Sequence, residues 1–365
     1  LLNGSTVANT LGGFDFAFTL PEVVNLGEAS IDLYVKGGFL TEEGNSYSHS
    51  FQIEEFRTPE FEVNARNVTT GPYFAGGEAL LAVQAKYYAG GGLQNAPVTW
   101  QVQTSPGKYI PPNWSDFVFG DWHPWWMMSY DYIDSWREDE STTETFSGTT
   151  DANGEHFLKL DFIQPDEDGE FPEPKSIVAQ ASVMDVNRQA WAGSTTLLVN
   201  PAKFYIGLRS EKFFVERGTP LKVDFIVTDL DGNAIAGQPV NLTAARLEWK
   251  YQQGEWVEVE TDPQTCRQTS TLEPGTCRFE TPLGGSYRIT AEVRDSSGRI
   301  NKTRIRRWVS GGQQPPARNV EQETVTLIPD RENYQPGETA HILVQSPFSP
   351  AEGLLTVGRS GFLYT

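Results

Sequence analysis

Hydrophobic and polar residues alternate along most of the chain with a period of two, which is typical of strands that bury one face. The alternation is clearest in residues 14–20, 31–36, 221–227 and 287–294. Intervals between Gly and Pro residues are mostly too short for helices, and no capping residue is followed by an apolar run of helical period. We therefore expect an all-β protein of antiparallel β-sandwiches in tandem, similar to immunoglobulin and fibronectin III domains.

A repeated block supports the tandem arrangement. It consists of an aromatic residue, a short polar link, a Gly and then an alternating strand, and its copies begin at Tyr73, Phe214 and Tyr334. A second shared block leads through a loop to Pro97 and Pro239. Each Pro stands where a strand is expected to start, a position that tolerates the missing N–H.

The repeat predicts four segments. Residues 57–200 and 201–312 are expected to be complete seven-stranded domains, the first with an insertion at 104–148. Residues 1–56 hold only the closing strands of an earlier domain, and residues 313–365 hold only the opening strands of a later one.

Charge and residue counts exclude several classes of function. The 365 residues include 28 Lys plus Arg and 48 Asp plus Glu, a formal net charge of -20, which repels nucleic-acid phosphates and anionic lipid. Four widely spaced His residues form no zinc pattern, and no phosphate-binding glycine motif occurs. We therefore expect no cofactor, no metal and no nucleic-acid partner.

The sequence has no 18-residue apolar run, no leader and no initial Met, so we expect a piece of a longer protein.

The two cysteines, Cys266 and Cys277, flank the turn pair Pro274-Gly275. We expect them to face each other near the base of a hairpin and to form a disulfide, which would indicate an oxidising compartment. Two reduced cysteines, or a redox or metal role, are the alternatives.

The insertion is unusually rich in aromatic residues and is a possible interaction loop. It holds Trp114, Trp122, Trp125, Trp126 and Trp136. Such residues could stack on sugar rings or bind a partner. We favour the alternative that they pack against the insertion itself or a neighbouring domain, because burying several indole rings orders a long loop.

Charged runs have two interpretations each. The acidic runs at 131–144 and 161–173 are expected to be solvated loops, with a calcium site as the alternative. Lys302, Arg304 and Arg306 share one face of a strand, which is either solvated or in contact with an acidic surface of a neighbouring domain.

We expect that the protein is not an enzyme, since no set of catalytic residues can be nominated from the sequence. A β-sandwich hydrolase that uses the acidic residues is an alternative.

Several blocks together resemble the bacterial α2-macroglobulin family. They begin at Phe56 (Phe-Arg-Thr-Pro-Glu-Phe), Asp185 (Asp-Val-Asn-Arg-Gln-Ala-Trp), Tyr205 (Tyr-Ile-Gly-Leu-Arg), Tyr287 (Tyr-Arg-Ile-Thr-Ala-Glu-Val) and Leu327 (Leu-Ile-Pro-Asp-Arg-Glu-Asn-Tyr-Gln-Pro-Gly-Glu). The resemblance implies seven-stranded macroglobulin-like domains. The chain would hold the end of the third, all of the fourth and fifth, and the start of the sixth.

The resemblance also implies a function. The family traps proteases: a protease cuts a bait segment, the molecule collapses around it, and a Cys–Gln thioester captures it. The thioester needs Cys-x-Glu-Gln, whereas this chain reads Cys266-Arg-Gln-Thr and Cys277-Arg-Phe-Glu, and no bait is identifiable. We therefore expect a scaffold portion of an endopeptidase inhibitor.

The expected partners are proteases, through the full-length protein, and neighbouring domains of the same chain. The expected location is the periplasm or cell envelope, in a lipoprotein held at the inner membrane by an anchor outside this chain. The alternative is a cell-surface adhesin or carbohydrate-binding array that uses the Trp-rich insertion.

Overall fold

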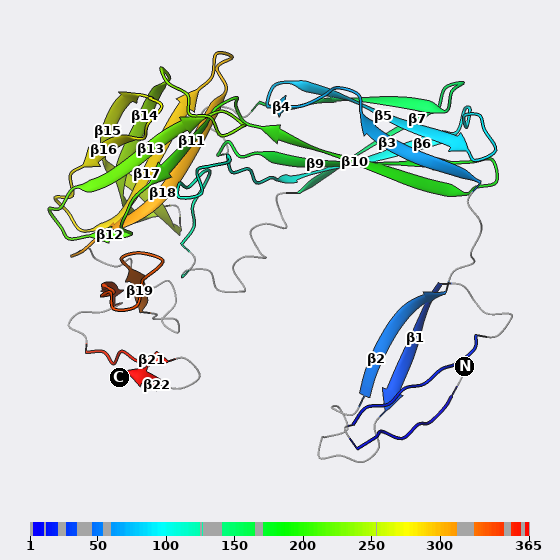
Figure 1. Cartoon of the computed structure of the whole chain (residues 1–365), viewed down its shortest axis with the longest axis horizontal. Helices are drawn as coiled ribbons and strands as arrows, with labels where there is room; N and C mark the ends of the chain where they lie inside the picture. Colours follow the sequence, from blue (N-terminus) through cyan, green and yellow to red (C-terminus); the bar gives the residue numbers. More distant parts are fainter. Residues whose placement is uncertain are drawn as a thin grey trace. The chain divides into compact units, whose positions relative to one another are not determined.

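The computed structural model describes residues 3–10, 12–20, 27–34, 46–53, 60–124, 126, 141–164, 171–252, 254–311, 325–346, 352–358 and 362–364. The described residues form strands and no helix, so the all-β prediction is confirmed (Figure 1). None of them forms a helix long and apolar enough to cross a membrane. The chain divides into two compact units, Leu1–Glu60 and Phe61–Thr365.

The first unit contains β1 (Gly27–Tyr34) and β2 (Ser46–Ile53), which pair antiparallel from Gly27↔Ile53 to Tyr34↔Ser46. Residues 14–20, expected to be a strand, lie outside any strand. Their Phe rings still stack along one side, with centroids 6.4 Å and 6.3 Å apart. The alternation thus correctly predicted that these side chains share one face. The prediction that the segment pairs as a strand was wrong.

The second unit begins with a sandwich of two sheets. Its strands are β3 (Phe61–Asn67), β4 (Tyr73–Phe74), β5 (Glu78–Tyr87), β6 (Pro97–Pro106), β7 (Thr142–Thr149), β8 (Glu155–Asp161), β9 (Lys175–Met184) and β10 (Ala190–Asn200). One sheet has the order β3-β5-β8 and the other β4-β10-β9-β6-β7. The apolar residues of the alternating strands meet between the sheets, where Trp100, Leu81 and Val83 are fully buried.

A second sandwich follows with the same topology. Its strands are β11 (Tyr205–Arg209), β12 (Phe214–Val215), β13 (Leu221–Thr228), β14 (Pro239–Gln252), β15 (Glu255–Thr269), β16 (Gly275–Phe279), β17 (Gly285–Arg294) and β18 (Ile300–Val309). The sheet orders are β11-β13-β16 and β12-β18-β17-β14-β15, which match the first sandwich strand for strand. The sequence repeat is therefore a repeat of topology.

Each sandwich contains one short strand that the seven-strand prediction did not include. The two-residue strands β4 and β12 pair parallel with β10 and β18 (Val199↔Tyr73 and Phe214↔Trp308). These strands carry the aromatic residue that opens the repeated block. Two residues are too few to show any alternation, so the sequence pattern does not reveal them.

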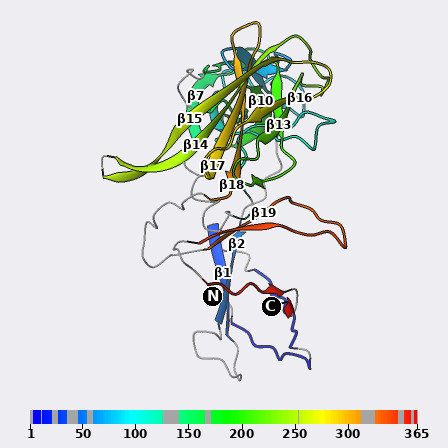
Figure 2. The ribbon, with the colours of Figure 1, turned by 90° about the vertical axis from the view of Figure 1, so that its left-hand side faces the viewer.

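The β14–β15 hairpin is longer than the sheet to which it belongs (Figure 2). β14 pairs with β17 only from Val240 to Leu247, whereas its pairing with β15 continues to Gln252↔Glu255. The end of this hairpin is therefore a two-stranded ribbon of β14 and β15 that extends past the end of β17.

The C-terminal segment holds β19 (Thr326–Pro329), β20 (Ile342–Gln345), β21 (Val357–Gly358) and β22 (Phe362–Tyr364). β19 pairs antiparallel with β20, and Ile328 is fully buried. The N–H of Phe213 donates to the carbonyl of Asp330 at 2.8 Å, which connects this segment to the second sandwich.

Candidate functional site

The most distinctive feature of the described residues is a segment of the first sandwich that binds the second. Residues 107–124, which follow β6, are called the strap. Val118 and Leu208 exchange both backbone hydrogen bonds, at 2.8 Å and 2.9 Å, so the strap adds to the edge strand β11. The N–H of Arg304 then donates to Gly120 at 3.0 Å, and the N–H of Trp122 donates to Arg304 at 2.9 Å, so the strap also pairs with β18.

The strap therefore closes the edge of the second sandwich at which its two sheets meet. β11 is an edge strand of its sheet, and β12 pairs with β18 only at Trp308 and Val309, so Arg304 lies on an uncovered stretch of β18. Unpaired strand edges invite pairing with other chains, and a covering segment removes that hazard.

An ion pair reinforces the pairing with β18. The guanidinium of Arg304 donates two hydrogen bonds to the carboxylate of Asp121, one of them from Nε to Oδ1 at 2.8 Å. The side chains are only 31% and 12% exposed. Hydrogen bonding to Asp121 holds the pKa of Arg304 above its usual value, against the opposing effect of burial. A bidentate pair of this kind fixes geometry as well as charge.

A second ion pair anchors the start of the strap on β11. Arg209 contacts the carboxylates of Asp116 and Asp224 and stacks over the ring of Phe117, 4.5 Å from its centroid. Phe117 is 5% exposed. The strap thus buries an aromatic side chain beside the strand that it extends.

Aromatic packing holds the far end of the strap. The ring of Trp122 stacks on Phe213 with centroids 5.5 Å apart and meets Trp308 edge-on at 6.4 Å. Arg307 contacts both Trp122 and Phe213, with its guanidinium 5.1 Å and 5.2 Å from the two ring centroids. Burial lowers the pKa of Arg307 to about 9. Stacking on aromatic faces offsets part of the cost of burying this cation.

The covalent linker between the sandwiches is buried as well. Ala202 is fully buried, and Tyr205, 2% exposed, donates its hydroxyl to Asn200 Oδ1 at 2.8 Å. The N–H of Lys203 donates to Asp295 Oδ2 at 3.1 Å. Linker and strap together form what we call the junction.

The junction accounts for several residues singled out from the sequence. Trp114, Trp122 and Trp126 all contact the second sandwich, Trp114 through a hydrogen bond from Nε1 to the carbonyl of Gly232 at 2.9 Å. Trp125 and Trp136 lie outside the described residues. Whether this aromatic segment also binds another molecule stays a prediction.

The two arginines of the basic face on β18, Arg304 and Arg306, each fit a different one of the two interpretations given above. Arg304 contacts an acidic residue of the neighbouring sandwich, Asp121, as the second interpretation proposed. Arg306 instead pairs with Glu258 at 2.7 Å, within its own sandwich. The part of the junction that the sequence did not reveal is the backbone pairing of Val118 and Gly120. The apolar run Phe117-Val118-Phe119 is the signal that could have indicated a strand-like segment there.

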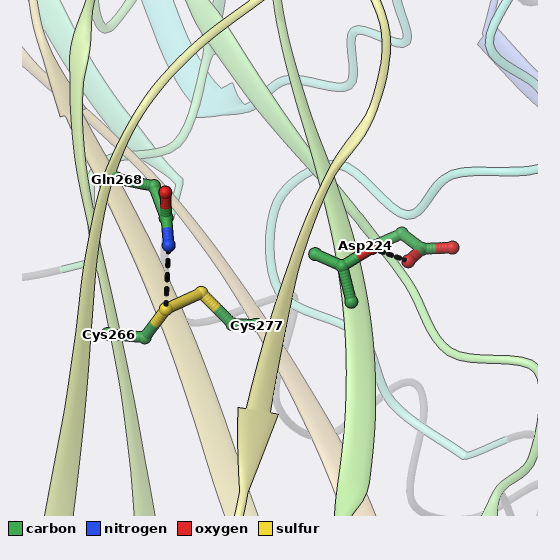
Figure 3. Close-up of a disulfide and its surroundings, with 5 residues drawn as sticks. Asp224, Cys266, Gln268 and Cys277 are labelled. Carbon is green, nitrogen blue, oxygen red and sulfur yellow. Dashed lines mark hydrogen bonds between the residues drawn. A yellow bond between two sulfur atoms is a disulfide. The ribbon is translucent and has the colours of Figure 1, made fainter.

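The two cysteines are bonded, but not across a hairpin base as expected (Figure 3). Cys266 lies on β15 and Cys277 on β16, which belong to different sheets of the second sandwich. The chain crosses from one sheet to the other between these strands, so the bond ties the two sheets together at the edge opposite the strap. Gln268 Nε2 lies 4.0 Å from Cys266 Sγ.

Metal ligation has no support among the described residues, which contain no group of three or more His, Cys, Asp or Glu placed to hold an ion. The Asp229 carboxylate accepts the N–H groups of Asp231 and Asn233 at 2.9 Å and 2.8 Å. It therefore caps its own turn. Most of the two acidic runs lies outside the described residues.

The topology and the repeat of one sheet order define a protein of tandem antiparallel β-sandwiches. No protein-family model matches the sequence. The chain is 24% identical over 99% of its length to an α2-macroglobulin homolog of Nostoc, of which it spans 18%. It is 23% identical over 62% of its length to α2-macroglobulin of Thermotoga maritima, and 24% identical over 69% to circularly permutated Ras protein 2 of Dictyostelium discoideum, covering 12% and 7% of those proteins.

A solved structure, that of trypsin-activated α2-macroglobulin from Escherichia coli, matches 87% of this chain and 21% of its own. The sequence identity is 18% and the TM-score is 0.46. The resemblance to α2-macroglobulins stated from the motifs is confirmed by the sequence relatives, and this chain spans a small part of their length.

Proposed function

We propose that this chain is a scaffold segment of a protease inhibitor of the α2-macroglobulin kind and performs no catalytic step. Similarity to an α2-macroglobulin homolog along 99% of the chain supports the family role. The observation that carries the mechanical part is the strap, which joins one sandwich to both sheets of the next. In this proposal the two sandwiches form a rigid spacer. The spacer keeps other domains of a longer inhibitor apart until a protease cuts that inhibitor.

The contacts at the junction support this role. Neighbouring domains of one chain move relative to each other by default unless their interface is large and well packed. Here four backbone hydrogen bonds join the strap to Leu208 and Arg304, and Gly120 donates a fifth to Thr303 Oγ1 at 3.0 Å. Each hydrogen bond contributes about 1 kcal/mol net, and the Asp121 pair contributes more, so these contacts oppose release of the strap.

We also propose an oxidising location, the periplasm or another part of the cell envelope. The bond between Cys266 and Cys277 supports this, because structural disulfides persist outside reducing compartments. Proteases would be partners of the longer protein rather than of this segment, which carries no Cys-x-Glu-Gln.

The test uses the longer protein that contains this segment. After incubation with trypsin, a trapping inhibitor leaves cleavage of a small peptide substrate largely intact but suppresses cleavage of a large protein substrate. Equal loss on both substrates, or no loss on either, contradicts the inhibitor proposal. A variant with Asp121→Asn should trap less effectively than the matched control Glu62→Gln, which removes an exposed charge on β3 away from the junction.

A further inference from the structure

Arg307 is a buried cation at the junction that lacks a carboxylate partner. It is 2% exposed, and its cross-strand neighbour on β17, Tyr287, belongs to the core of the second sandwich, so the Arg307 side chain lies on the inner face of its sheet. The neighbouring arginines on β18, Arg304 and Arg306, each pair with a carboxylate. Arg307 forms no ion pair with any residue that the structure describes.

The hydrogen bonds of this guanidinium are incomplete as well. A guanidinium has five N–H donors, and among the described residues Arg307 donates from Nη1 to the carbonyl of Arg306 at 2.8 Å. Its Nε is buried and has no hydrogen-bond partner within the described part of the chain. Burying a charge that is neither paired nor fully hydrogen-bonded costs free energy, and the lowered pKa of Arg307 has this burial as its cause.

The strap supplies part of the cover over this cation. The guanidinium lies against the rings of Trp122, from the strap, and Phe213, from the second sandwich itself. Trp126 extends the cover onto Phe213 and Trp308, at centroid distances of 5.1 Å and 5.5 Å. When the far end of the strap leaves, Arg307 loses Trp122 and regains water on that side. Closing the strap therefore removes hydration from a cation, and stacking on an indole ring offsets only part of that cost.

The preceding part of the strap is held by contacts whose polar groups are paired. Val118 and Leu208 satisfy each other's N–H and carbonyl groups, and Asp121 pairs with Arg304. These contacts favour the docked strap without burying an unpaired charge. The strap thus has a firmly held part, residues 118–121, followed by a far end that docks over an uncompensated cation.

We propose that Arg307 is a release point of the strap: its buried charge lowers the stability of the docked far end, so that this end opens before residues 118–121. An apolar side chain in its place would dock Trp122 more tightly, because replacing buried charges by apolar residues of similar volume often stabilises a protein. The release point gives a rigid spacer a defined place at which it yields. The inference concerns the strap alone and holds whether or not the longer protein inhibits proteases.

Native-state hydrogen exchange of the 365-residue chain tests the release point. The amide of Trp122 donates to the Arg304 carbonyl at 2.9 Å and reports the far end, whereas the amide of Val118 donates to Leu208 at 2.8 Å and reports the firmly held part. In the unaltered chain Trp122 should exchange faster than Val118 after correction for intrinsic rates. Arg307→Met should slow exchange at Trp122 about tenfold and change Val118 by less than about twofold.

Two further variants separate charge from shape. Arg307→Lys keeps a buried charge in the form of a more strongly hydrated ammonium, so exchange at Trp122 should become faster. Arg306→Met is the matched control. It removes a neighbouring cation that already pairs with Glu258 at 2.7 Å and should leave exchange at Trp122 unchanged.

The proposal is wrong if Trp122 in Arg307→Met exchanges at the same rate or faster. It is also wrong if this variant unfolds at a lower urea concentration or does not fold, because the cation would then stabilise the docked strap. Equal directions of change in Arg307→Met and Arg307→Lys would show that side-chain shape decides, and an equal slowing in Arg306→Met would show that the effect is not specific to the buried charge. Joint opening of Trp122 and Val118 in the unaltered chain would likewise overturn the proposal.

Discussion

Replacing Asp121 by Asn keeps the size of the side chain and removes the charge that Arg304 binds. The pair makes two charge-assisted hydrogen bonds and is largely shielded from water, with side chains 12% and 31% exposed. Fully exposed ion pairs contribute about 0.2–1 kcal/mol, whereas a hydrogen bond to a charged group contributes about 1.5–3 kcal/mol. We therefore expect the strap to lose about 2 kcal/mol of docking free energy, which corresponds to about 30-fold more opening.

Native-state hydrogen exchange measures that opening directly. The amides of Leu208 and Arg304 donate to strap carbonyls, so both should exchange about 30-fold faster in Asp121→Asn. The amide of Ile289, in the middle of the second core, should not change. A double-mutant cycle with Arg304→Gln should recover a coupling of about 2 kcal/mol, since each single change removes the same pair.

Two results would contradict a role of the Asp121–Arg304 pair in holding the strap. Unchanged exchange at Leu208 and Arg304 would mean that the ion pair does not hold the strap. An equal rise at Ile289 would mean that the whole sandwich is destabilised rather than the contact. Glu62→Gln, which removes an exposed charge on β3, serves as the control and should change none of these rates.

Three further predictions concern the cores. Reducing the bond between Cys266 and Cys277, 11 residues apart, should lower the free energy of unfolding in urea by about 2–3 kcal/mol; finding two free thiols in the unreduced, unfolded protein would reject the bond. Gly193→Ala should cost about 1–3 kcal/mol in the same assay, because the new Cβ would lie 2.6 Å from a carbonyl oxygen of β3, whereas an unchanged stability would show that the sheets can separate there. His156 accepts a hydrogen bond from Trp100 at 3.1 Å and burial lowers its pKa, so the unfolded state binds its proton first; stability should fall as pH drops below about 6.5, less steeply in His156→Gln, and an identical pH profile in the two proteins would contradict this.

The alternating pattern predicted the strands of both sandwiches well because each strand buries one face. The starts of β6 and β14 at Pro97 and Pro239 were placed correctly, since Pro has few acceptable positions in a sheet. The pairing of the two cysteines could be guessed from their separation. Their placement on different sheets could not, because a turn signal such as Pro274-Gly275 does not show whether the chain folds back or crosses over.

The junction was harder to predict because its specificity lies in backbone groups. Val118 and Gly120 bind through N–H and carbonyl groups that every sequence has, so their residue types carry little information. The side chains were more informative. The Trp residues favoured packing on a neighbouring domain, and Arg304 suggested an acidic partner there, but neither pointed to Asp121 in particular.

The rigidity of the junction is tested most directly by the distance distribution between spin labels on the two sandwiches. Gln94→Cys and Lys222→Cys place labels at exposed positions, one on each sandwich. We expect one narrow distribution, which broadens when Val118→Pro and Asp121→Asn together remove a backbone donor and the ion pair of the strap. A broad or multiple distribution before that change, or the same distribution after it, would show that the two sandwiches are not held together by the strap.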